Sequence, residues 1–522
     1  MSKASETLII ELSAQQLQEL LERIAPGIQE SDLNIIRALS INYQLLVDLL
    51  AKKNVSIQRI KNLLFGAPTE KTRQVLKQPK SPPKKKKKRK GHGRLGAKDY
   101  RGATSVAVAH PELKAGDRCP ECGNGKLSLK KPNTRIRISA QPIFPATRYD
   151  MEKLRCNLCG KIFNAPVPQE AQSGKYDPSV ANMLAMLRYG SGMPNYRIEK
   201  LQQDLGVPLP ASTQWELLKP SAEVYKPVYQ HLIYSAAQSQ LIYHDDTTMT
   251  VLSLLGQPRE QDSQRSGIFT TGVVAEVEGH RIALFFTGVN HSGENLDLLL
   301  AQRAIDLPPP MQMCDALSRN QSKEFETVLI HCLIHARRNF VDQTPNFPDQ
   351  CAFLLESLRE VYRHEAQAKE QGLDAQGRLS FHQTHSQSVM DELKKWMEQQ
   401  FEEKKVEPNS GLGQAINYML KRWTQLTRFL ELPGAPLDNN ICERTLKKAI
   451  LHRKNSLFYK NQNGADVGDL FMSLIHTCRF CEANPLDYLN TLQDNAAQLA
   501  KDPQQWLPWN YRATLQAQQT NN

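Results

Sequence analysis

The sequence predicts an α/β protein in which a short series of strands lies between helical segments. Three consecutive runs of β-branched and aromatic residues after Gln238 are separated by turns, a pattern typical of strands: LIYHDDTTMTVL, SGIFTTGVVAEVEG and RIALFFTGV. A helical pattern runs from about 324 to 430, where Ile416, Leu420 and Leu426 recur on one side of a helix. The chain has 522 residues, of which 40% are hydrophobic, and is long enough for about three or four domains.

Residues 1–76 are predicted to be helical. Ser13 and Gln16 form a capping-box pattern at the start of a short amphipathic helix. From Ile35 to Leu63, nine positions spaced alternately by four and three residues form a possible coiled-coil seam that would promote self-association. Three of these positions are polar and a break is expected at Asn54, so a helical hairpin is the alternative.

Residues 77–104 are predicted to be a basic, disordered linker, because their Pro, Gly and clustered like charges cannot form a core. Between Lys77 and Arg101 there are twelve Lys or Arg residues and one acid, which accounts for nearly all of the formal charge of +12. We expect this segment to track the phosphates of DNA. A solubilising spacer, or a look-alike of a nuclear-import signal, is the alternative. The expected contacts are Lys84, Lys85, Lys86, Lys87, Lys88, Arg89 and Lys90.

Residues 105–168 are predicted to form a zinc-binding module that resembles a zinc ribbon. Cys119 and Cys122, and then Cys156 and Cys159, each form a Cys-x-x-Cys-Gly knuckle. Four thiolates make a closed tetrahedral site for a structural zinc ion, with no open position for catalysis. Four unrelated thiols would not explain the repeated spacing. The pair Cys478 and Cys481 is expected to be structural and buried. Three other cysteines lack a metal-ligand pattern: Cys314, Cys332 and Cys442.

Residues 169–237 are predicted to be a helical, DNA-binding region. Val180, Met183, Leu184 and Leu187 lie on one face of a helix, and a Gly-rich turn and a second short helix follow. This spacing is similar to a helix-turn-helix, although any helical hairpin shares it.

Carboxylates from distant parts of the chain are the candidates for chemistry. Asp245 and Asp246 lie in an otherwise apolar strand, a costly place for two acids unless one faces a site. Asp315 ends the short strand MQMCD, and Glu443 begins the helix ICERTLKKAILH. Together they could hold Mg²⁺ for phosphodiester chemistry. The alternatives are a solvated edge strand, a helix or turn cap, and a capping box in which Asn440 is the N-cap of the helix that carries Glu443.

At these residues the sequence resembles the insertion sequence 66 family of bacterial DDE transposases. Matching segments occur in order along most of the chain, beside the two Cys pairs: LLFGAPTEK, YHDDTTMTVL, MQMCDALSRN, HCLIHARRNF, DNNICERTLKKAILHRKNSLF and WLPWNY. The resemblance implies that Asp245, Asp315 and Glu443 are the catalytic acids. It implies that Arg453 and Lys454 contact phosphate, with ordinary surface charge as the alternative. The chain departs from the family where Asp246 replaces a glutamate and where ALSRN follows Asp315.

The resemblance further implies a ribonuclease-H-like fold, in which a mixed sheet bears the aspartates and a following helix bears the glutamate. The catalytic core would comprise 238–345 and 433–492, with a helical insertion at 346–432 and a C-terminal tail at 493–522. Two Mg²⁺ ions, or Mn²⁺ in their place, would be bound by Asp245, Asp315 and Glu443. The enzyme would nick each transposon end with water and join the freed 3′-hydroxyl to target DNA.

The expected partners are double-stranded DNA of the transposon ends and of the target, other copies of the chain assembled on that DNA, and small companion proteins of the same element. The sequence has no apolar run of 18 residues and no signal-peptide pattern, so we expect a cytoplasmic, nucleoid-associated protein that does not contact membranes. Two other functions stay open: a catalytically inert DNA-binding regulator, and a nuclease without strand transfer. His335, Arg337 and Arg338 are either phosphate-neutralising groups or ordinary helix residues.

Overall fold

The structure is a computed structural model. It describes residues 161–520 apart from 257–266, and 106–159 apart from 123, 131–134, 137, 139–142, 156 and 158. Nearer the N-terminus it describes Thr72–Leu76 and a few single residues: Arg23, Gly27, Leu33 and Ile36. The chain divides into two compact units, one formed by 1–80 with 343–356 and the other by 81–342 with 357–522. The predicted coiled coil and the basic run from Lys84 to Lys90 lie outside the described residues.

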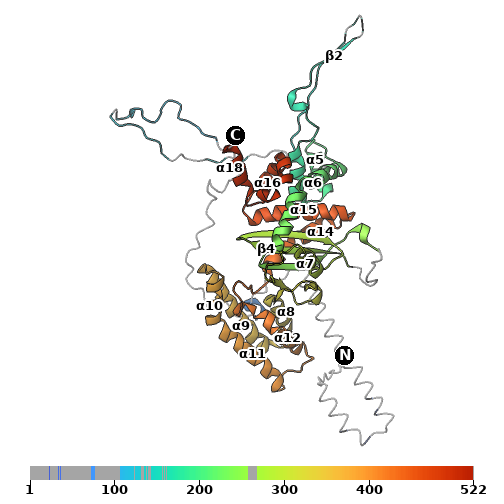
Figure 1. Cartoon of the computed structure of the whole chain (residues 1–522), viewed down its shortest axis with the longest axis vertical. Helices are drawn as coiled ribbons and strands as arrows, with labels where there is room; N and C mark the ends of the chain where they lie inside the picture. Colours follow the sequence, from blue (N-terminus) through green and yellow to red (C-terminus); the bar gives the residue numbers. More distant parts are fainter. Residues whose placement is uncertain are drawn as a thin grey trace, which may run out of the picture. The chain divides into compact units, whose positions relative to one another are not determined.

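A five-stranded mixed sheet lies at the centre of the second unit, with the strand order β5-β4-β3-β6-β7 (Figure 1). β3 (Leu241–Thr248), β4 (Phe269–Val277) and β5 (His280–Gly288) are antiparallel and correspond to the three predicted strands. β6 (Met311–Cys314) is parallel to β3, and Asp315 follows it directly, as predicted. The sequence prediction of a mixed α/β protein is therefore confirmed.

The fifth strand corrects one prediction. β7 (Val328–His331) runs parallel to β6, within a stretch that we expected to be helical throughout. The run VLIH is short and apolar, and periodicity cannot distinguish a buried strand of this length from a helix. The strand leads directly into α8 (Leu333–Gln343), so its position matters for the residues that α8 carries.

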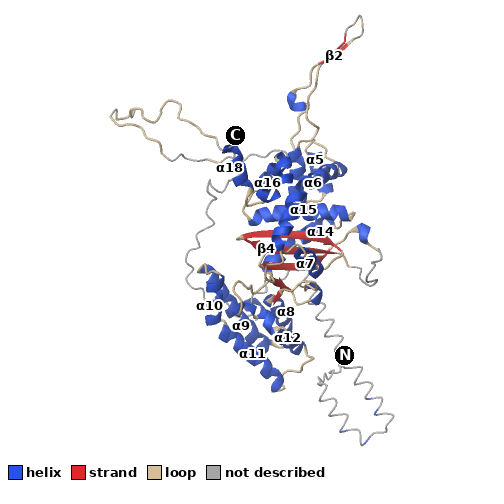
Figure 2. Cartoon of the chain, viewed as in Figure 1, coloured by secondary structure: helices blue, strands red, loops and turns tan. Residues whose placement is uncertain are grey.

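Helices come before, between and after the strands of this sheet in the sequence. In Figure 2, helices lie above and below the sheet. Before the sheet come α4 (Pro178–Ala185), a π-helical turn η4 (Met186–Gly190), α5 (Asn195–Asp204) and the long α6 (Ala211–Ala237). α7 (Ser292–Leu300) connects β5 to β6. The helices that follow α8 up to the third predicted acid are α9 (Pro348–Glu370), α10 (Ala375–His385), α11 (Gln387–Glu402), α12 (Gly411–Leu420) and α13 (Trp423–Leu426).

The C-terminal part of the chain is also helical. Its main elements are α14 (Asn440–Ser456), α15 (Gln462–Phe480), α16 (Pro485–Asp494), α17 (Ala496–Lys501) and α18 (Tyr511–Thr520). The apolar residues of the last segment, Trp506, Leu507 and Tyr511, are buried in the same core as the sheet. Among the described residues, none of the helices combines the length and apolar character needed to cross a membrane.

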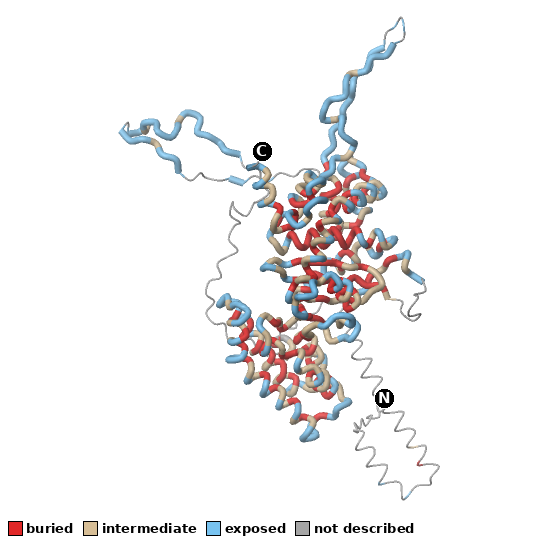
Figure 3. The backbone as a smooth tube through the Cα atoms, in the orientation of Figure 1, coloured by how far each residue is buried: buried red, intermediate tan, exposed pale blue. Residues whose placement is uncertain are grey.

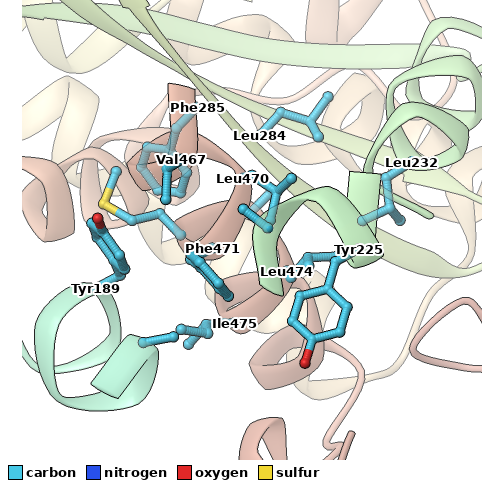
Figure 4. Packing of buried hydrophobic residues seen from close by; sticks show 14 of the residues in the cluster. Tyr189, Tyr225, Leu232, Leu284, Phe285, Val467, Leu470, Phe471, Leu474 and Ile475 are labelled. Atoms are coloured by element: carbon cyan, nitrogen blue, oxygen red, sulfur yellow. The ribbon is translucent and has the colours of Figure 1, made fainter. Parts of the chain in front are cut away.

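α15 joins the sheet to the helices that precede it. Phe471 stacks on Tyr189 of η4 with ring centroids 5.6 Å apart, and meets Tyr225 of α6 edge-on at 6.0 Å (Figure 4). These rings and Phe285 of β5 belong to one hydrophobic core. The buried residues follow the central strands and α15, whereas all residues of the small antiparallel pair β1 (Lys153–Arg155) and β2 (Ile162–Asn164) are exposed (Figure 3). The predicted DNA-binding helices thus share a core with the sheet.

The outer edge of β5 is completed by side chains of α15. Thr477, Ser473 and Asp469, spaced four residues apart on one face of the helix, accept hydrogen bonds from the backbone N–H groups of alternate residues of the strand: Ala283, Phe285 and Thr287. A buried strand edge would otherwise leave these donors unsatisfied, at a cost of about 1–3 kcal/mol each. The polar residues in an otherwise apolar helix therefore close the sheet.

Of these three residues of α15, Asp469 is the one that can carry a charge, and it is buried. Burial raises its pKa to about 8, although hydrogen bonds from the Thr287 hydroxyl and backbone N–H oppose the shift. Its carboxyl is therefore mostly protonated at neutral pH. The Thr287 hydroxyl, which donates to Asp469, lies 2.8 Å from the hydroxyl of Thr270.

We predict that Asp469→Asn makes the stability of this unit less dependent on pH. In the unfolded chain an aspartate titrates near pH 4, so between about pH 4 and 8 the folded protein binds a proton that the unfolded chain has released. The free energy of unfolding of the unmodified protein should therefore fall as pH rises through this range. The asparagine amide mimics the protonated acid and should flatten the slope. Urea unfolding between about pH 5 and 8 measures the slope of the unfolding free energy against pH. Asp466→Asn, at an exposed position, is the control. Equal slopes for the unmodified protein and both variants would contradict the raised pKa of Asp469.

Candidate active site at the centre of the sheet

Asp245 and Asp315 lie at the same level on adjacent parallel strands. Tyr243 of β3 pairs with Met313 of β6. Asp245 comes two residues after Tyr243, and Asp315 comes two residues after Met313. Asp315 accepts hydrogen bonds from the backbone N–H of Leu317 at 3.2 Å and from the Asn320 side chain at 2.6 Å, both at Oδ1. These bonds fix the loop after β6, and with it the carboxyl group that faces Asp245.

Glu443 reaches the same place from α14. Asp245 pairs across the sheet with Gly272 of β4, and the thiol of Cys442 donates a hydrogen bond to the Gly272 carbonyl at 3.2 Å. A Cβ atom on Gly272 would lie 3.1 Å from Leu446, so glycine lets α14 approach the strand closely. Glu443 follows Cys442, and its charge is among those that raise the pKa of Asp245.

Asn439 fixes the start of α14. Its side-chain amide donates a hydrogen bond to the carbonyl of His244, the residue before Asp245, at 2.9 Å. Its backbone N–H lies 3.3 Å from the Cys332 sulfur, and Leu333 donates to the carbonyl of Leu437 at 3.0 Å. The N-terminus of α14 is thus held both to β3 and to the start of α8.

Asp245 lies in a partly buried position near other acids. Burial raises the pKa of Asp245 to about 7, and the negative charges of Asp315, Asp246 and Glu443 add to that effect. A bound cation would offset these negative charges, and three carboxylates offer the oxygen ligands that Mg²⁺ prefers. The donor set therefore fits the predicted magnesium site.

Asp246 serves a different purpose from its neighbour. Its side chain is only 4% exposed and lies 3.2 Å from Nδ1 of His291 and 3.6 Å from the guanidinium of Arg319. His291 precedes α7, and its backbone N–H donates to the Glu294 carboxylate at 2.7 Å. Successive residues of a strand point to opposite faces. Asp246 thus turns toward α7, where His291 and Arg319 are its partners, whereas Asp245 turns to the opposite face, where the charges of Asp315 and Glu443 raise its pKa.

The carboxylate of Glu443 lies against α8. His335 Nε2 is 3.7 Å from one of its oxygens and the Arg338 guanidinium is 3.8 Å from the other, and the glutamate side chain is 17% exposed. The capping-box alternative does not hold, because α14 begins at Asn440 with Asn439 as its N-cap, so that Glu443 is the fourth helical residue and not the third. The sequence analysis left the roles of His335 and Arg338 open. In the structure, both side chains lie beside the carboxylate of Glu443.

The predicted zinc ligands are only partly described. Cys119 and Cys122 lie in a turn where Cys119 N–H donates to the Gly125 carbonyl at 2.7 Å. Hydrogen bonds from the backbone of Gly125 and Asn124 and from the Cys119 side chain lower the pKa of Cys122, which favours the thiolate form that binds metals. Cys159 is exposed, and Cys156 lies outside the described residues. The four-cysteine zinc site stays a prediction.

Arg453 and Lys454 differ in their surroundings, although they are neighbours at the end of α14. The Arg453 guanidinium donates hydrogen bonds to the hydroxyl of Thr247 at 3.1 Å, to the hydroxyl of Thr248 at 2.7 Å and to the Thr248 carbonyl. Lys454 is exposed. Arg453 therefore ties α14 to the end of β3, and phosphate contact by either residue stays a prediction.

We predict that Arg453→Ala lowers the free energy of unfolding by about 1–3 kcal/mol, because it removes charge-assisted hydrogen bonds to β3. Lys454→Ala is the matched control and should change it by less than about 0.5 kcal/mol, as is usual for an exposed side chain. Urea unfolding followed by circular dichroism measures both. Equal effects of the two substitutions would show that the bonds of Arg453 do not hold the helix in place.

Comparison with known proteins shows the family of the chain. The chain is 24% identical over 418 residues to the uncharacterized protein y4hP of Sinorhizobium fredii, covering 76% of this chain and 73% of that protein. It is 25% identical over 430 residues to the uncharacterized protein y4jD of the same organism, covering 78% and 80%. The family model described as "Transposase IS66 family" matches residues 173–467, a range that includes Asp245, Asp315 and Glu443. The chain belongs to the IS66 family of transposases.

Proposed function

We propose that this transposase is a DDE enzyme that binds transposon ends, nicks them and joins the freed 3′-hydroxyl to target DNA. The observation that carries the proposal is the meeting of three acids from separate elements: Asp245 on β3, Asp315 after β6 and Glu443 on α14. A mixed sheet with the first acid on its central strand, the second after the adjacent parallel strand and the third on a later helix is the arrangement expected of a ribonuclease-H-like fold.

The chemistry requires that excess negative charge be neutralised at one place. Like charges about 4 Å apart repel by about 4 kcal/mol at an intermediate dielectric. Cations bound between the carboxylates would offset this repulsion. Two Mg²⁺ ions, or Mn²⁺, when bound would activate the attacking oxygen and stabilise the leaving oxygen of the phosphodiester. Asp245, Asp315 and Glu443 would hold them. Positioning and charge neutralisation, and not proton transfer by a protein side chain, would provide the rate enhancement.

Basic residues at the rim of this site would receive the DNA. Arg319 and Arg338 have side chains that are 47% and 42% exposed and lie beside Asp246 and Glu443 respectively, so each extends from the acids toward solvent. Lys454 would contact phosphate from the end of α14. The same protein would use its other predicted modules to bind the ends: the zinc site at Cys119, Cys122, Cys156 and Cys159, the basic run from Lys84 to Lys90, and the helices of 169–237.

The setting of the reaction follows from the family. Double-stranded DNA of the transposon ends and of the target would be the substrate, several copies of the chain would assemble on it, and small companion proteins of the same element would take part. The protein would work in the cytoplasm, associated with the nucleoid. These statements are proposals that rest on the transposase family and on the basic segments of the sequence.

We predict that Asp245→Asn, Asp315→Asn and Glu443→Gln each abolish cleavage and leave DNA binding within about twofold. Each substitution keeps the shape of the side chain and removes the charge that would hold a divalent ion. Purified protein is incubated with DNA that contains the transposon ends and Mg²⁺; nicked and joined products are separated on a gel, and binding is measured by mobility shift.

Different outcomes separate the competing functions. Binding by the unmodified protein without nicking would identify an inert regulator, and nicking without joining would identify a nuclease. Cleavage retained by any one of the three variants would remove that residue from the site. Thermal unfolding of each variant shows whether a loss of activity reflects a loss of fold.

We predict that Asn439→Ala slows cleavage by about a hundredfold without changing DNA binding. The substitution removes the bond that holds α14 to the His244 carbonyl, and a displacement of about 1 Å at a reacting group can have an effect of this size. Asn461→Ala is the control, because Asn461 caps α15 by accepting a bond from Gly464 N–H at 2.9 Å, away from the acids. Each of the two variants loses a side-chain hydrogen bond at the start of a helix. If both lost activity equally, the loss would reflect lower stability of the fold and not a displacement of the acids.

A further inference from the structure

A second set of potential ligands shares Glu443 with the three-acid site. The Cys332 sulfur, a ring nitrogen of His335 and a carboxylate oxygen of Glu443 all lie within 4.8 Å of one another. Cys332 lies between β7 and α8, and His335 lies one helical turn further on, so both face α14 from the same side. Sequence analysis found no metal-ligand pattern at Cys332, because Glu443 comes from a distant helix.

The spacing of these atoms suits an ion better than a hydrogen bond. His335 Nε2 and Glu443 Oε1 are 3.7 Å apart, which exceeds the usual length of a hydrogen bond. Two ligands that are each about 2 Å from a shared ion are separated by about this distance. Within the described part of the chain, Glu443 Oε1 is buried without a hydrogen-bond partner. A cation between them would satisfy an acceptor that the protein itself leaves unsatisfied.

The surroundings of Cys332 are compatible with a thiolate ligand. Cys332 is buried, and the backbone N–H of Asn439 lies 3.3 Å from its sulfur. A binding cation would displace the thiol proton from the sulfur into the solvent. The resulting thiolate and the Glu443 carboxylate would together balance the two charges of a divalent ion, and a water molecule can fill the fourth position.

The ligand chemistry selects the kind of ion. Sulfur and imidazole ligands favour Zn²⁺ and other late transition metals, whereas Mg²⁺ prefers oxygen ligands alone. Two classes of cation thus compete for one carboxylate. With Glu443 engaged by a transition metal on the α8 side, Asp245 and Asp315 alone would have to hold the magnesium ions.

We propose that Cys332, His335 and Glu443 form a Zn²⁺ site, and that zinc binding there inhibits the enzyme by withdrawing Glu443 from Asp245 and Asp315. The inhibition rests on the proposed function, whereas the binding of zinc does not. The site is distinct from the four-cysteine module, which has no residue in common with it.

Zinc binding is tested by isothermal titration of ZnCl₂ into the full-length protein whose four-cysteine module is already loaded with zinc. The unmodified protein should bind one more Zn²⁺ per chain than Cys332→Ser, which keeps an acceptor for the Asn439 N–H and loses the soft ligand. Cys314→Ser is the matched control, because Cys314 is equally buried beside an acid but lies outside the cluster, and it should bind as the unmodified protein does. His335→Gln should lose the same ion, which guards against misfolding of one variant. Equal stoichiometry in all four proteins would overturn the site.

Inhibition is tested by nicking assays at constant Mg²⁺ and rising ZnCl₂, with each protein normalised to its own rate without zinc. Loss of a metal-site partner commonly lowers affinity by 10–100-fold, so the zinc concentration that halves the rate should rise by at least about tenfold in Cys332→Ser and stay unchanged in Cys314→Ser. An equal zinc response would overturn the inhibition even where the extra ion binds. Failure of the unmodified protein to nick DNA at all would count against the proposed function, and the titration would still decide the site.

Discussion

The partial burial of Asp245 beside other acids is the constraint on which this site depends. Burial, with the charges of Asp315, Asp246 and Glu443, raises its pKa to about 7, so ionisation of Asp245 is unfavourable there. The bonds that hold the acids in place come from backbone and amide groups: Asn439 to β3, Cys442 to Gly272, and Asn320 to Asp315. These groups position the acids without neutralising them, which leaves their negative charge available to a cation.

The rest of the unit supplies rigidity to the strands that bear these acids. β3 is central, and its neighbour β4 is paired on its far side with β5, whose own free edge is closed by α15. The chain uses Thr477, Ser473 and a mostly protonated Asp469 at that edge instead of a sixth strand. Because α15 also packs against the helices before the sheet, the predicted DNA-binding helices and the acids are parts of one core.

The sequence predicted much of this arrangement, and its failures have physical causes. Strands β3 to β5 were visible because β-branched and aromatic runs between turns mark them, and β6 because a short run after three prolines ends in Asp315. β7 was missed because three apolar residues and a histidine carry no periodicity. The pairing of Asp246 with His291 and Arg319, and that of Glu443 with His335 and Arg338, join residues far apart in the chain, which local patterns cannot reveal. Alternation did predict that Asp245 and Asp246 face opposite ways, but not which of them meets the other acids.

Glu443 is the point at which two chemical environments meet. On one side lie carboxylates, which suit a hard cation; on the other lie the sulfur of Cys332 and the ring of His335, which suit a softer one. A glutamate on the first turns of a helix can serve either side through small changes of its side-chain torsions, whereas the aspartates on the sheet have shorter and more constrained side chains. The torsional freedom that would let the third acid complete the proposed magnesium site is thus the same property that would let a competing metal withdraw it.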